Sequence, residues 1–261
     1  MLIQPLNSNS KGNNSANGIL TANRQKSYNI LSNLGFKVEE SAIKIEEKLL
    51  ESSARQLEKL ELKYGALSRC QLELFCAENH NNDLAFTQTS LSSRLLHLRL
   101  SLCPSHYADR EKLIKECLKA RDERRFMAFA DEMAEVYPVT HEYGHILINI
   151  LISDRADWAQ YEAAVNNTIE IRNEEVQKIL QKVMKEFTEK YYRDIYQEIA
   201  KSALEMKPDK WLGEYLSEYA REGGYSEKLA EIFANSQLDK SNVLGKAMKE
   251  WLEKEGITSV K

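Results

Sequence analysis

Apolar residues recur at helical spacing over most of the chain. They form one stripe over residues 41–64, with glutamates and lysines on the opposite face and Gly65 in the position of a C-terminal cap. Similar stripes predict helices over residues 25–34 and 109–124, and a long helix or hairpin within residues 155–206. Most of the protein is therefore expected to be helical.

The middle of the chain has the pattern of a small β-sheet. Short runs of strand-forming residues cover residues 71–75, 84–89 and 95–100, and the turn-rich segment 80–83 separates the first two. A further helix is predicted over residues 139–152. The fold class expected is α+β, dominated by helices, with a small sheet before this helix. An edge strand of such a sheet could pair with an extended peptide.

Composition and charge narrow the class of protein. Residues 1–24 are rich in Asn, Ser and Gly and are predicted to be disordered, whereas residues 25–261 are expected to form one domain with an inserted helical region at about 155–206. The net charge of −4 gives no reason to expect a nucleic-acid partner. Neither a membrane-spanning run nor a secretory signal is recognisable, so a cytoplasmic protein is expected. The four cysteines form no C-x-x-C pair, and reduced thiols are expected.

The most specific chemical signal is the segment H-E-Y-G-H at residues 141–145. Residues four apart lie on one face of a helix, so His141 and His145 can bind one ion, and Glu142 can act on a water at that ion. This is the H-E-x-x-H arrangement of zinc peptidases. Pro138 is suited to the first turn of the helix. The alternative is an amphipathic helix with histidines on its surface, which the apolar run after His145 disfavours.

A catalytic zinc needs a third protein ligand. No histidine follows His145, so a carboxylate is required. The best candidate segment is a helix that begins after Gly223-Gly224, with Ser226 as its N-cap and Glu227 and Glu231 on one face. Either Glu227 binds the metal while Glu231 orients a ligand histidine, or the two form a solvent-exposed acidic stripe. Spacing alone leaves both interpretations open.

Three segments together resemble a known family. These are T-H-E-Y-G-H at 140–145, S-E-Y at 217–219 and E-K-L-A-E-I-F at 227–233. They resemble the metallopeptidase domains attached to phage minor head (head-morphogenesis) proteins, and their order is similar to that in the catalytic domain of anthrax lethal factor. Those proteins are glutamate-type zincins, or gluzincins. The resemblance covers roughly residues 37–256.

The resemblance implies a role for each matching residue. His141, His145 and Glu227 would bind Zn²⁺, Glu142 would be the general base, and Glu231 would stand behind the ligands.

It also implies that Tyr219 steadies the oxyanion. Tyr219 stands eight residues before Glu227, one more than expected from lethal factor, so Tyr215 and Tyr225 are alternatives.

The function expected is that of a zinc-dependent endopeptidase with a protein or peptide substrate. One alternative is a non-catalytic phage or mobile-element structural protein that retains a stabilising zinc site. Another is a toxin-like effector with a single host target. Phage or mobile-element proteins are accordingly possible partners, and virion association or delivery into a host are possible locations. No separate portal-binding or head-morphogenesis module is recognisable in the chain.

Overall fold

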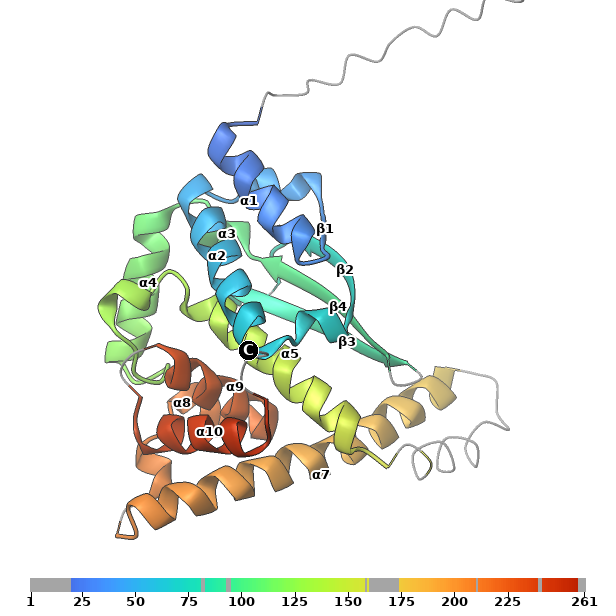
Figure 1. Cartoon of the computed structure of the whole chain (residues 1–261), viewed down its shortest axis with the longest axis vertical. Coiled ribbons are helices and arrows are strands. Elements are labelled where there is room, and N and C mark those ends of the chain that lie inside the picture. The colour runs from blue at the N-terminus through green and yellow to red at the C-terminus, as the bar shows by residue number, and fades with distance from the viewer. Residues whose placement is uncertain are drawn as a thin grey trace, which may run out of the picture.

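The computed structural model of the 261-residue chain describes residues 20–80, 83–92, 95–157, 159, 174–209, 211–238 and 241–257. In this part of the chain helices dominate and pack beside a small sheet (Figure 1), so the predicted α+β class is confirmed. The α-helices are α1 Ala22–Asn33, α2 Glu47–Tyr64, α3 Pro104–Tyr107, α4 Arg110–Asp122, α5 Tyr137–Arg155, α7 Glu174–Met206, α8 Glu218–Glu222, α9 Gly224–Gln237 and α10 Val243–Lys254. The strands are β1 Lys37–Val38, β2 Gln71–Cys76, β3 Ala85–Ser92 and β4 Leu95–Leu102.

The sheet has the strand order β1-β2-β4-β3. Strands β1, β2 and β4 are parallel, whereas β3 is antiparallel to β4 and forms an edge. The three predicted strands are confirmed with small changes at their ends. β1 was not predicted because two residues are too few to produce a period-two pattern.

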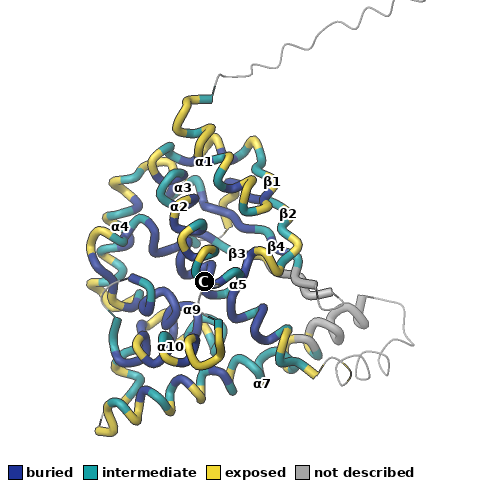
Figure 2. Tube along the Cα trace, in the orientation of Figure 1, coloured by how far each residue is buried: buried dark blue, intermediate teal, exposed yellow. Residues whose placement is uncertain are grey.

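Helix α5 occupies the centre of the molecule. It packs against β3 and β4, against α2, and against α9 and α7 (Figure 1). Its first turn contains Pro138, as predicted, and most of its length is buried (Figure 2). The positions with partial exposure include His145, Asn149 and Ser153, which follow one stripe at four-residue spacing. One side of this central helix therefore faces a cleft rather than the core.

Caps fix the ends of several helices near the sheet. Gly65 adopts a left-handed conformation (φ 65°) and ends α2, as the sequence predicted. The side chain of Asp109 caps α4 by accepting a hydrogen bond from the backbone N–H of Lys112. Thr21 caps α1 in the same way, so the predicted disorder is wrong for residues 22–24, which are helical. Residues 1–19 lie outside the described residues.

The region predicted to be helical over 155–206 contains α7, and residues 160–173 lie outside the described residues. Helix α7 contacts α5, α9 and α10. Buried apolar side chains from both halves of the chain, from Leu31 to Leu252, form one continuous core. None of the helices in the described ranges combines the length and the apolarity needed to cross a membrane.

Candidate metal centre

The site forms where α5 and α9 cross. Gly144 lies at the crossing point, and a Cβ atom there would stand 3.0 Å from Cδ1 of Phe233 and 3.1 Å from Cα of Ala230. Only the absence of a side chain lets the two helices approach this closely. The crossing brings Glu227, in the first turn of α9, to the face of α5 that carries His141 and His145.

Three ligand atoms converge at this crossing. Nε2 of His145 lies 3.1 Å from Nε2 of His141, and Oε2 of Glu227 lies 3.2 Å from Nε2 of His141 and 3.3 Å from Nε2 of His145. At a zinc–ligand distance of about 2.0–2.1 Å, tetrahedral angles place neighbouring ligand atoms about 3.3–3.4 Å apart. The residues thus fit a zinc ion in both chemistry and spacing.

The electrostatics of the cluster also favour a cation. Burial acts to lower the pKa of His141, but the hydrogen bond with Glu227 and the charges of Glu231 and Glu142 outweigh it and raise the pKa to about 10. Burial acts to raise the pKa of Glu227, yet hydrogen bonds with His141 and His145 hold this pKa well below its usual range. Positive charge at this point is therefore strongly stabilised.

Glu231 lies behind the cluster and is completely buried. Its carboxylate accepts hydrogen bonds from the backbone N–H of Met127 (2.8 Å), the hydroxyl of Ser217 (2.9 Å) and the hydroxyl of Tyr137. Its Oε1 also faces Nδ1 of His141 at 3.4 Å, a distance typical of an ion pair rather than a tight hydrogen bond. The interpretation of Glu231 as part of a solvent-exposed acidic stripe is therefore wrong.

Glu142 stands beside the three ligand atoms without joining them. It lines two adjoining cavities of about 260 and 270 Å³. Asp83, Ala85 and Tyr219 line both cavities as well, so the beginning of edge strand β3 forms one wall of the cleft. A carboxylate in this position can exchange a proton with a molecule in the cleft.

Tyr219 is the tyrosine that the structure places in the cleft. Its ring centroid lies 5.9 Å from that of His141, and its side chain lines both cavities. Burial and the charges of Glu227 and Glu142 raise the pKa of its phenol, which stays protonated at neutral pH. Of its two alternatives, Tyr225 packs on Tyr196 of α7, and neither it nor Tyr215 is among the residues that line the two cavities.

Ser226 has a different position from the one predicted. Helix α9 begins at Gly224, with Gly223 as its N-cap, so Ser226 lies inside the first turn and is not the cap. A left-handed Gly224 (φ 80°) lets α8 continue directly into α9. The Ser226 hydroxyl is instead 3.1 Å from Nδ1 of His145.

Sequence reasoning missed further residues around the ligands, namely Asp83, Asn149, Tyr192, Ser217 and Tyr137. Asn149 stands four residues after His145, so helical spacing could have indicated it.

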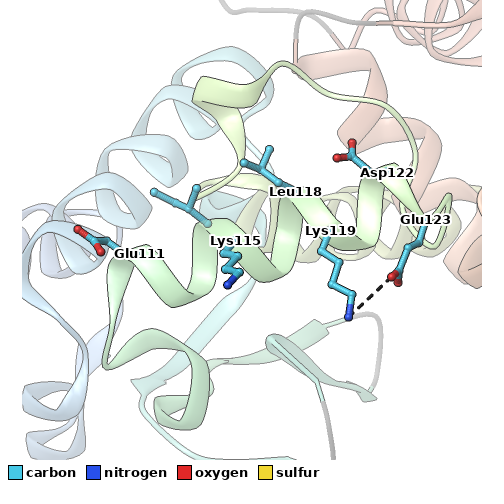
Figure 3. A pocket seen from close by; sticks show the side chains of 7 residues that line it. Glu111, Lys115, Leu118, Lys119, Asp122 and Glu123 are labelled. Carbon is cyan, nitrogen blue, oxygen red and sulfur yellow. Dashed lines mark ion pairs between the residues drawn. The ribbon is translucent and has the colours of Figure 1, made fainter.

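Two other features of the described residues are weaker candidates. A larger hollow of about 640 Å³ lies on the outer face of α4, but its charged groups have both signs and Lys119 pairs with Glu123 at 3.7 Å (Figure 3).

A second group of potential ligands comprises Glu39, Cys76 and Glu78. The guanidinium of Arg99 lies 2.5 Å from Glu78 and 3.4 Å from the Cys76 sulfur, so a cation is already present there.

Comparisons of the chain with protein-family models, with curated proteins and with solved structures found no match. The functional argument therefore depends on the geometry of the crossing between α5 and α9.

Proposed function

We propose that this protein is a zinc-dependent endopeptidase of the glutamate-ligand zincin type. The observation that carries the proposal is the convergence of His141, His145 and Glu227 within 3.1–3.3 Å, with Glu142 beside them and facing a cleft. A carboxylate beside the ligands that does not itself bind the metal is a feature of a hydrolytic zinc site rather than of a purely structural one.

The chemistry of each part follows from its position. Zinc bound by the three ligands would supply a Lewis acid that makes a water more acidic and polarises a peptide carbonyl. Glu142 would take the proton of the attacking water and give it to the leaving amine. The protonated hydroxyl of Tyr219 would donate a hydrogen bond to the carbonyl oxygen as its negative charge develops.

The cleft also suits an extended peptide. Strand β3 is an edge strand, and residues 83–87, at and just before its beginning, line the cavities beside Glu142. Free backbone groups of an edge strand can pair with a substrate strand. A substrate held in this way would pass across Glu142 and Tyr219, which stand on the other side of the same cavities.

A structural zinc site would have a different form. Such sites are usually closed by four protein ligands. Within the described part of the chain, three ligand groups meet here, and two cavities adjoin them. This arrangement favours catalysis over a scaffold role. Phage or mobile-element proteins are candidate substrates on the strength of the motif resemblance alone.

The test combines metal analysis with peptide cleavage. Purified protein is expected to contain about one zinc per chain and to cleave members of a peptide library. Glu142→Gln should keep the zinc and lose at least about 100-fold in turnover, whereas Glu132→Gln, an exposed acid in a 3₁₀ turn, should behave like wild type. Zinc far below one per chain, or activity that survives Glu142→Gln, would overturn the proposal.

A further inference from the structure

A line of polar side chains leads outward from His145. Nδ1 of this histidine lies 3.1 Å from the hydroxyl of Ser226, in the first turn of α9. The hydroxyl of Tyr192, in α7, donates a hydrogen bond to Oδ1 of Asn149. Ser226, Tyr192 and Asn149 line the same cavity as His145. The side chains of Ser226 and Tyr192 also interact, and this interaction acts to lower the pKa of Tyr192, whereas burial raises it to about 12.

The donors and acceptors in this line favour one direction of hydrogen bonding when the ring of His145 is neutral. Tyr192 gives its one hydrogen to the carbonyl oxygen of Asn149, so it can only accept from Ser226. When Ser226 directs its own hydrogen at Tyr192, it can only accept from His145. Nδ1 of His145 must therefore carry the hydrogen, which leaves the lone pair of Nε2 directed at Glu227 and His141.

The first and last residues of this line, His145 and Asn149, lie on the same helix. Asn149 follows His145 by one helical turn of α5, while Ser226 belongs to α9 and Tyr192 to α7. The partners of the His145 ring nitrogen therefore come from two further helices, α9 and α7, besides α5 itself. His141 is oriented differently, because the charged carboxylate of Glu231 faces its Nδ1. The two histidines consequently have separate partners that direct their Nε2 atoms toward the same point.

We propose that Ser226, Tyr192 and Asn149 act as positioning residues that hold His145 in the Nδ1–H tautomer required for metal binding. This inference depends on the proposed zinc site and extends it to α7, which lies outside the H-E-x-x-H motif and the helix that supplies Glu227. Partners of this kind typically change metal affinity by about 10- to 100-fold when they are removed.

The experiment measures zinc affinity by competition with a chelator, which needs no substrate. Tyr192→Phe removes one hydroxyl and keeps the ring. It should weaken zinc binding by about tenfold. Ser226→Ala should cost at least as much, and the double variant should lose less than the product of the two single losses because both changes interrupt one line. Tyr191→Phe is the matched control, since its hydroxyl bonds to the backbone of Asp157.

Two spectroscopic readouts separate positioning from a general loss of structure. The tautomer of His145 in the metal-free protein is read from the ¹⁵N chemical shifts of its ring, and Tyr192→Phe should produce a mixture of tautomers. The absorption bands of the cobalt-substituted protein should shift in Tyr192→Phe and not in Tyr191→Phe. If wild type binds zinc and Tyr192→Phe binds it equally well with an unchanged tautomer, the positioning role is wrong. If wild type binds no zinc, the proposed function is wrong as well.

Discussion

Oε1 of Glu231 lies 3.4 Å from Nδ1 of His141, on the side of the imidazole ring opposite Glu227. An ionised carboxylate can only accept hydrogen bonds, so it favours a hydrogen on Nδ1. The Nε2 lone pair of a neutral ring then faces the other two ligand atoms. This relationship gives a completely buried acid a specific function, and it can be tested without changing any proposed ligand.

Glu231→Gln should weaken zinc binding and lower stability. The amide would direct an N–H₂ group at one of the donors that now meet the carboxylate, and one buried group would lose its partner. We expect a loss of about 1–3 kcal/mol in the free energy of unfolding and about 10- to 100-fold in zinc affinity. Chemical denaturation and chelator competition measure the two effects, with the exposed Glu250→Gln as control. An unchanged zinc affinity would show that Glu231 serves the fold alone.

Glu227→Gln should abolish stoichiometric zinc binding. The substitution keeps the size of the side chain but removes the negative charge that offsets the metal, and neutral amides are poor zinc ligands. The loss of affinity should exceed the roughly 10- to 100-fold expected for a residue that only supports a ligand. Metal analysis after dialysis checks this, with Glu222→Gln of α8 as the matched control. Full zinc content in Glu227→Gln would exclude Glu227 as the third ligand.

Much of the site was predictable because it depends on local periodicity. The four-residue spacing of His141 and His145 needs only a helix, and Pro138 and the apolar run around the motif predicted that helix correctly. Glu227 could be proposed but not chosen from spacing, since an exposed acidic stripe has the same pattern. The burial of Glu231 excludes the exposed stripe, and burial depends on how α9 packs on α5.

Other parts could not be predicted because they depend on tertiary contacts. Tyr192 meets Asn149 across 43 positions of sequence, and the rotation of α7 against α5 that allows this has no local signature. Ser226 is a residue type that often caps helices, but α9 begins at Gly224 with Gly223 as its N-cap, three residues before the predicted cap. In both cases packing between helices determines which group a side chain meets.

The cysteines should react slowly in the native protein. Burial raises the pKa of Cys117 to about 12, and burial together with the charge of Glu61 raises that of Cys70 to about 12. Since the thiolate is the reactive form, both thiols should be nearly inert toward a thiol-specific dye at pH 8. The raised pKa also means that their contribution to stability is complete below about pH 8.5 and declines as the pH rises toward 12.

Dye labelling in native buffer and in guanidinium measures how fast the thiols react. All four thiols should react after unfolding. Rapid labelling of Cys117 in native buffer, at the rate of a free cysteine, would contradict the burial of this part of the core.

Gly144→Ala tests whether the close approach of α5 and α9 creates the site. A methyl group there would meet the backbone of Ala230 at 3.1–3.2 Å and the ring of Phe233 at 3.0 Å, and the backbone cannot move aside without displacing α9. Overpacking of this kind costs about 1–3 kcal/mol, and the displacement should also weaken zinc binding. In an uncrowded helix the same change would stabilise the protein by about 1 kcal/mol. The sign of the change in melting temperature of the metal-free protein therefore distinguishes a crowded crossing, where it falls, from an uncrowded helix, where it rises. A higher melting temperature with full zinc affinity would mean that the helices do not depend on Gly144 for their contact.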